Sequence, residues 1–114
     1  MLYQYILGGI SGPRVDHFLA NLKLFYEFPN LRMIDDNTYI MECKSGLSFL
    51  KDEYKYYSLF ALEDVTDLTL EGFKYPLTNY NLSHTSGLGV SNEVINEATI
   101  SFSTGRLLLI KTKE

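Results

Sequence analysis

A short polar segment rich in glycine contains the side chains best suited to binding a small molecule. Its sequence, over residues 86–93, is Ser86-Gly87-Leu88-Gly89-Val90-Ser91-Asn92-Glu93. Glycine lets a backbone approach a ligand closely, and small hydroxyl and amide side chains such as those of Ser91 and Asn92 exchange hydrogen bonds with polar groups. The segment therefore predicts polar recognition of a small molecule.

A second candidate site is the loop from Gly8 to Pro13, which leads into a predicted helix. The exposed N–H groups and the dipole at a helix start both favour an anion there. Arg14 could neutralise phosphate charge or be an ordinary exposed arginine. Asp16 lies in the first turn, beside the positive end of the dipole. Many α/β proteins use such a loop only to turn the chain, so the loop by itself is a weak signal.

Two segments of the C-terminal half resemble the signature of the thiamine-binding β-domain of bacterial thiamine pyrophosphokinases. They are Gly72-Phe73-Lys74-Tyr75-Pro76-Leu77 and Gly89-Val90-Ser91-Asn92-Glu93. Residues 98–102 with the Gly105 turn resemble the family's closing hairpin, and Gly8 to Asn21 resembles the end of its catalytic domain. In that second part Arg14-Val15-Asp16-His17 resembles the family's Gly-Gly-Arg-x-Asp-His motif, with Pro13 in place of the second glycine.

The resemblance implies a role for several residues. Ser91 is expected to hydrogen-bond the aminopyrimidine of thiamine, and Asn92 either to contact thiamine or to hold the turn that presents Ser91. Asp16 is expected to act in catalysis, as a magnesium ligand or by positioning the substrate hydroxyl. Arg14 is the expected phosphate-binding residue. Proline has no N–H, so a contact that the family makes through the amide of the second glycine has no counterpart at Pro13.

The resemblance also implies an activity. The family transfers a pyrophosphoryl group from ATP to thiamine, with Mg²⁺, to give thiamine diphosphate, and its acidic metal site lies upstream of the Arg-x-Asp-His motif. No acidic metal-site motif of that kind occurs in this sequence. We therefore expect a C-terminal portion of a homodimeric enzyme that supplies thiamine binding and dimerisation, needs no cofactor for this and is inactive alone. The alternatives are a non-catalytic β-domain for a small metabolite and a structural dimerisation module.

The elements that would position these residues follow from periodicity and turn signals. Apolar residues at helical spacing, Val15, Phe18, Leu19, Leu22 and Phe25, predict one amphipathic helix between Pro13 and Pro29. Strands are predicted at residues 2–7, 31–34, 38–43, 47–50, 57–62, 68–70, 80–82, 89–91, 98–102 and 107–111.

This pattern predicts a mainly β protein. We expect residues 45–114 to form a sandwich or jelly-roll-like thiamine-binding domain. Residues 1–44 are expected to be a strand, helix and hairpin remnant of an α/β catalytic domain. Pro76 lacks a ladder donor, which argues against a regular central strand from Phe73 to Leu77.

Composition limits the possible partners and compartments. The net charge of -4 argues against nucleic acid, which is bound through basic surface. No apolar run approaches the roughly 20 residues of a membrane helix, so no membrane partner is expected. Cys43 is the only cysteine, which rules out an internal disulfide and fits a reducing, cytoplasmic compartment. Its expected role is that of a small buried apolar group.

Overall fold

The computed structural model describes residues 4–7, 23–85 and 91–113, and it confirms that the protein is mainly β. Residues 23–27 are helical and the chain leaves the helix before Pro29, while the rest of the predicted helix lies outside the described residues. The strands are β1 (Gln4–Leu7), β2 (Leu31–Ile34), β3 (Thr38–Cys43), β4 (Leu47–Leu50), β5 (Tyr56–Phe73), β6 (Leu77–Leu82), β7 (Val94–Ser101) and β8 (Thr104–Thr112).

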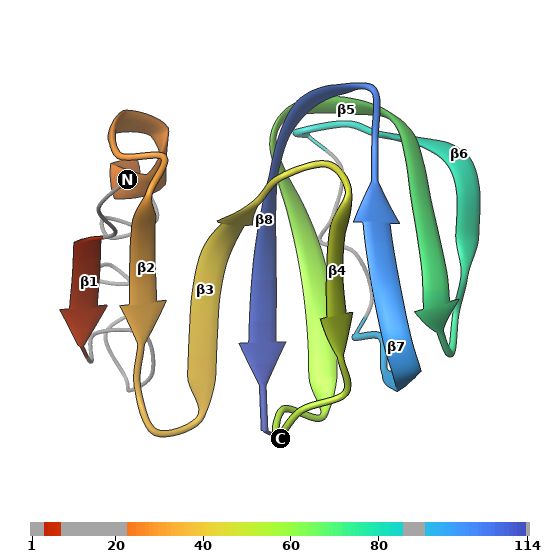
Figure 1. Cartoon of the computed structure of the whole chain (residues 1–114). Coiled ribbons are helices and arrows are strands. Elements are labelled where there is room, and N and C mark those ends of the chain that lie inside the picture. The colour runs from red at the N-terminus through yellow and green to blue at the C-terminus, as the bar shows by residue number, and fades with distance from the viewer. Residues whose placement is uncertain (1–3, 8–22, 86–90, 114) are drawn as a thin grey trace.

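The strands form one curled sheet in the order β1-β2-β3-β8-β5-β7-β4, with β6 paired to β5 (Figure 1). β1 and β2 are parallel, and every other pair among the described strands is antiparallel. A parallel pair needs a crossover connection, and here the helical residues 23–27 belong to that connection. The predicted hairpin around Asp35-Asp36-Asn37 is confirmed, because β2 pairs with β3 and Asp35 Oδ1 accepts hydrogen bonds from the N–H groups of Asn37 and Thr38.

The longest strand, β5, pairs with two strands in succession along one edge. Residues 56–66 pair with β8, and residues 69–73 pair with β7. β7 and β8 therefore follow one another along β5, with a bend at residues 102 and 103, and they do not pair with each other. The predicted closing hairpin between residues 98–102 and 107–111 is wrong for this reason: each strand was recognised from local alternation, but its partner is β5.

β5 also joins two strands that were predicted to be separate, residues 57–62 and 68–70. The connecting residues include the exposed acids Glu63, Asp64 and Asp67, whose polarity is typical of a turn. The register shifts at several points in this region, and such bulges let a strand bend without ending. Asp67 has a φ of 54°, in the left-handed region that Asp tolerates better than most residues.

The bend in β5 places two halves of the sheet face to face, with the main apolar core between them. Tyr57, Leu59, Leu107 and Leu109 come from one half, and Leu70, Phe73, Val94 and Ile100 come from the other. The rings of Phe49 and Tyr57 stack across the core with centroids 5.4 Å apart. The two layers of the predicted sandwich are thus two halves of one sheet.

A second, smaller core lies on the opposite face of the first half of the sheet. It consists of Phe25, Leu31, Met33, Ile40, Leu62 and Leu108. On β8, Leu107 and Leu109 face the main core while Leu108 faces the second core, as the alternation of a strand requires. Cys43 is buried as predicted, and burial, with a smaller contribution from nearby Glu42, raises the pKa of its thiol to about 12.

A buried ion pair fixes the end of the helix to the sheet. Arg106 donates to both carboxylate oxygens of Glu42, over 2.7 and 3.1 Å, and its Nη2 also donates to the backbone carbonyl of Phe25 over 2.7 Å. The last carbonyls of a helix lack partners within the helix and carry partial negative charge. Arg106 neutralises both this charge and that of Glu42, whose side chain is 4% exposed.

Two glycines allow close packing of neighbouring strands. Gly72 has a φ of 81°, and a Cβ there would lie 1.8 Å from the carbonyl oxygen of Glu97 in β7. Gly105 has a φ of 106°, and its Cβ would lie 2.2 Å from the carbonyl oxygen of Asp64 in β5. Backbone atoms of paired strands cannot move aside cheaply, so these positions need glycine.

We expect Gly72→Ala to lower the free energy of unfolding by at least about 2 kcal/mol more than Gly46→Ala does, because it adds a backbone clash to the cost of positive φ. Gly46 is a matched control, with a φ of 87° and nothing within 4 Å of the added Cβ. Urea unfolding measures both variants. Equal losses would show that the β5–β7 contact yields without cost.

Candidate functional site

The predicted site residues fall into two groups. Arg14 and Asp16 lie outside the described residues, as does the loop before Arg14. Ser91 and Asn92 lie just before β7, and they differ sharply in burial. Ser91 is exposed, whereas Asn92 is 6% exposed. The predicted strand over residues 89–91 is wrong at Ser91, which precedes an isolated bridge, and its other two residues are outside the described part.

The side chain of Asn92 holds the turn between β5 and β6. Its Oδ1 accepts a hydrogen bond from the N–H of Tyr75 over 2.9 Å, and its Nδ2 donates to the carbonyl oxygen of Tyr75 over 2.8 Å. The same Oδ1 accepts the N–H of Glu93 over 3.0 Å. One side-chain amide therefore fixes the backbone of Tyr75 on both sides, where Pro76 has ended regular pairing.

The backbone of Asn92 is bound as firmly as its side chain. Its N–H donates to the carbonyl oxygen of Tyr57, and its carbonyl accepts the N–H of Tyr57, both over 2.8 Å. These bonds form an isolated bridge between residue 92 and the start of β5. Ser91 is thus joined directly to a residue that is hydrogen-bonded to two separate parts of the fold.

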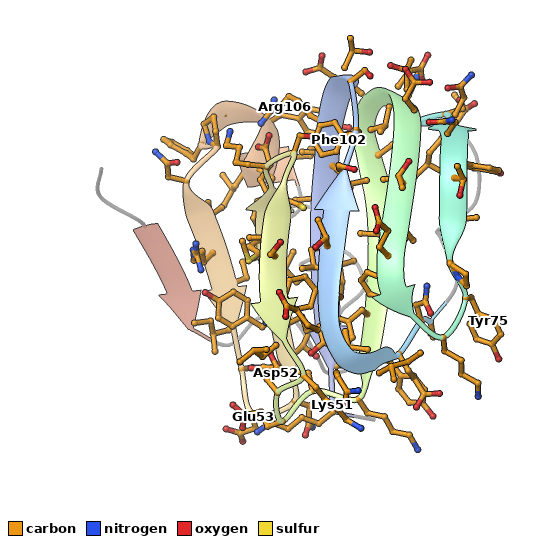
Figure 2. The ribbon with its side chains drawn as sticks, turned by 45° about the vertical axis from the view of Figure 1, so that its right-hand side comes forward. Lys51, Asp52, Glu53, Tyr75, Phe102 and Arg106 are labelled. Atoms are coloured by element: carbon orange, nitrogen blue, oxygen red, sulfur yellow. The ribbon has the colours of Figure 1, made fainter. Side chains whose placement is uncertain are left out.

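The aromatic and acidic side chains next to Asn92 in the motif divide between surface and core. The side chain of Tyr75 is 53% exposed, and Glu93 forms an ion pair of 3.6 Å with Lys74. Phe73, in contrast, is 4% exposed and packs edge-on against Phe49 and Tyr57. Figure 2 shows Tyr75 at the same end of the sheet as Asp52, with Arg106 at the opposite end.

A lysine surrounded by aromatic rings occupies the same end. Tyr39, Lys111 and Tyr57 are cross-strand neighbours on β3, β8 and β5. The Nζ of Lys111 lies 5.4 to 5.7 Å from the ring centroids of Tyr39, Phe49, Tyr54 and Tyr57. Ring faces attract a cation at such distances, and they also shield it from water. We call these five residues, together with Asp52, the Lys111 cluster.

Asp52 supplies the negative charge of the Lys111 cluster. Its carboxylate accepts hydrogen bonds from Lys111 Nζ over 2.8 Å, from the N–H of Tyr54 over 3.0 Å and from the hydroxyl of Tyr57. Partial burial by itself would raise the pKa of Asp52, but the bonds from Lys111, Tyr57 and Tyr54 outweigh it and hold this pKa below its ordinary value. Burial and the bond to Asp52 raise the pKa of Tyr57, so its hydroxyl remains a donor.

Sequence reasoning did not identify the Lys111 cluster. Tyr54, Tyr56 and Tyr57 are crowded together in the sequence, but they differ in burial, because Tyr57 is only 1% exposed. The cluster depends on the pairing of three strands, and no local pattern gives that register. Within the described residues the structure has no group of three or more histidine, cysteine or acidic side chains that could hold a metal ion, and no helix long and apolar enough to cross a membrane.

The geometry defines a class: a curled, mainly β domain in which the serine of a Ser-Asn-Glu segment is exposed while the asparagine that follows it is anchored. Residues 43–109, more than half of the chain, match the family described as thiamin pyrophosphokinase, vitamin B1 binding domain. The chain belongs to this family.

Individual relatives agree with this assignment. The thiamine pyrophosphokinase of Bacillus subtilis is 40% identical over 93% of this chain and 53% of its own length. Its crystal structure superposes with a TM-score of 0.84, at 38% identity over 97% of this chain and 56% of that one. The enzyme from Geobacillus thermodenitrificans gives a TM-score of 0.83, at 34% identity over 96% of this chain and 54% of that one. The chain thus spans about half the length of these relatives.

We expect Asn92→Ala to lower the free energy of unfolding by about 2 kcal/mol, because it leaves the N–H and carbonyl groups of Tyr75 without their partner. Asn96→Ala is the control: Asn96 has an exposed side chain on β7 and should change stability by less than about 0.5 kcal/mol. Urea unfolding compares the two. Similar values for both variants would show that the Asn92 amide does not hold the turn.

The Lys111 cluster predicts a dependence of stability on pH. Because the pKa of Asp52 is lower in the folded chain than in the unfolded chain, its contribution is present above the ordinary aspartate value of 3.8 and is lost as the pH falls through the folded pKa. Asp52→Asn should therefore flatten the acid side of the stability curve. Asp36→Asn, which changes an exposed turn residue, is the control. Thermal unfolding from about pH 6 to about pH 3 tests this, and parallel curves for Asp52→Asn and wild type would contradict it.

Proposed function

We propose that this chain is the thiamine-binding part of a thiamine pyrophosphokinase and that Ser91 donates or accepts a hydrogen bond with the aminopyrimidine of thiamine. The observation that carries the proposal is the contrast between Ser91, which is exposed, and Asn92, which is buried and bonded to Tyr57 and Tyr75. A binding group works best when its own position is fixed by neighbours that do not touch the ligand. Asn92 belongs to the site in this sense, by positioning Ser91.

A thiamine site at Ser91 would have to recognise an aromatic cation. Thiamine combines a positive charge with an aminopyrimidine ring, which aromatic and acidic groups suit. The exposed ring of Tyr75 and the half-buried carboxylate of Glu93 flank the Asn92 side chain through their backbones. These two residues are the best-placed walls among the described residues.

The reaction of the whole enzyme is part of the proposal. Residues 1–44 would be the end of an α/β catalytic domain, and residues 45–114 the thiamine-binding domain. Asp16 would act in catalysis, as a Mg²⁺ ligand or by orienting the thiamine hydroxyl, and Arg14 would bind phosphate of ATP. The parallel pairing of β1 with β2 supports an α/β origin for the first part. We propose that pyrophosphoryl transfer needs the remainder of the enzyme, so that this chain alone binds thiamine without turning it over.

Assembly and location complete the proposal. The chain would act as a homodimer, because the resemblance implies this for the family. A cytoplasmic location is supported by the use of cysteine: Cys43 is the only one in the sequence and is a free, buried thiol.

Isothermal titration calorimetry with thiamine, thiamine diphosphate and ATP tests the proposal. We expect the chain to bind thiamine, and Ser91→Ala to weaken this binding about fivefold to tenfold, since one hydrogen bond contributes about 1 kcal/mol. Ser48→Ala is the matched control, because Ser48 has an exposed hydroxyl on β4 that bonds Thr99.

The outcomes separate the competing functions. Unchanged thiamine affinity in Ser91→Ala would remove Ser91 from the site. Binding of another ligand instead of thiamine would favour a metabolite-binding domain without catalysis. No binding to any of the three would favour a structural dimerisation module.

A further inference from the structure

The Lys111 cluster is connected to Ser91 by an unbroken chain of contacts. Lys111 bonds Asp52, Asp52 accepts the hydroxyl of Tyr57, and the backbone of Tyr57 forms both bonds of the bridge to Asn92. Asn92 is covalently joined to Ser91.

The position of the Tyr57 side chain is determined from three directions. Its ring stacks on Phe49 at 5.4 Å and meets Phe73 edge-on at 6.2 Å, while its hydroxyl reaches Asp52. A tyrosine held at both ring and hydroxyl has little freedom to rotate, and its backbone is constrained with it. Through the two backbone hydrogen bonds of the bridge, the fixed position of Tyr57 also restrains Asn92, just before β7.

Stability alone does not explain a charged network at this place. The neighbouring core is apolar, and a partly buried ion pair is often no more stabilising than well-packed apolar residues. Such a network does favour one arrangement over its alternatives, because every donor must meet its acceptor. A binding residue next to the network would benefit from that single arrangement.

We propose that Lys111, Asp52 and Tyr57 act as positioning residues for thiamine binding, by fixing Asn92 and thereby the orientation of the Ser91 hydroxyl. The inference rests on the proposed function of Ser91. In this proposal the three residues do not contact thiamine themselves.

Affinity measurements on Tyr57→Phe test this inference. The substitution keeps the ring and removes only the hydroxyl that reaches Asp52, and we expect it to weaken thiamine binding about fivefold. Tyr54→Phe is the matched control: Tyr54 is also a ring of the Lys111 cluster, but it bonds Asp52 through its backbone N–H, which the substitution leaves in place. Its affinity should stay at the wild-type value.

A double-mutant cycle separates positioning from a general loss of structure. If Tyr57 acts through Ser91, Tyr57→Phe should cost no further affinity once Ser91→Ala is present, because contacting or linked residues are not additive. Losses that add, or an unchanged affinity in Tyr57→Phe, would overturn the inference. Absence of thiamine binding in wild type would instead overturn the proposed function of Ser91.

Two further variants keep the test decisive if Tyr57→Phe folds poorly. Lys111→Met should weaken thiamine binding about as much as Tyr57→Phe, and Lys111→Arg should restore part of the loss. Lys113→Met is the control, since Lys113 also pairs with an acid and lies 5.8 Å from the ring centroid of Tyr54, but its acid is Glu53, at 3.3 Å, and not Asp52. Equal effects of Lys111→Met and Lys113→Met would contradict the inference.

Discussion

The pairing of β5 with β8 and then with β7 is the constraint on which the rest of the structure depends. Because one strand crosses from one half of the sheet to the other, the two halves cannot separate without breaking the longest ladder among the described strands (Figure 1). The bend is possible because Asp67 adopts positive φ and because Gly105 lets the backbones meet. Once the ribbon has bent, its apolar faces enclose the main core.

The central strand β8 shows how charge and apolar burial together fix the register. Leu107, Leu108 and Leu109 are fully buried, and Arg106 and Lys111 lie on either side of them. Each cation meets an acid from a distant part of the chain, Glu42 or Asp52. A shift of β8 by one residue would bring a charge towards the core and separate both ion pairs. The loss of folding free energy would be far larger than the stabilisation that the ion pairs provide. The two ion pairs therefore specify one alignment of β8.

Local sequence patterns predict most of the strands but few of the pairings between strands. β2, β3 and β4 begin and end where alternation and turn residues predict, and Pro76 lies between β5 and β6 as expected. The errors have one cause. The acids at residues 63–67 suggest a turn, and residues 98–111 suggest a hairpin, because periodicity reports which face is buried but not which strand lies alongside.

The candidate site shows the same division. Ser91 and Asn92 can be found from the sequence, because they belong to one continuous motif. The Lys111 cluster cannot, because it joins β3, β4, β5, β8 and the loop before β5 across positions 39 to 111. Only the register of the assembled sheet brings Tyr39 and Tyr57 to either side of Lys111.

The arrangement also bears on the charge of a ligand at this end of the sheet. A free lysine near Ser91 would repel a cation such as thiamine. Lys111 is instead paired with Asp52 and covered by aromatic rings, and Lys74 is paired with Glu93, so both positive charges are balanced locally. Compensated pairs produce a weak field at a distance, whereas hydrogen-bonding groups act only at contact. In our proposal, recognition at this end depends on the orientation of the Ser91 hydroxyl, which the bridge between Asn92 and Tyr57 would fix through the backbone.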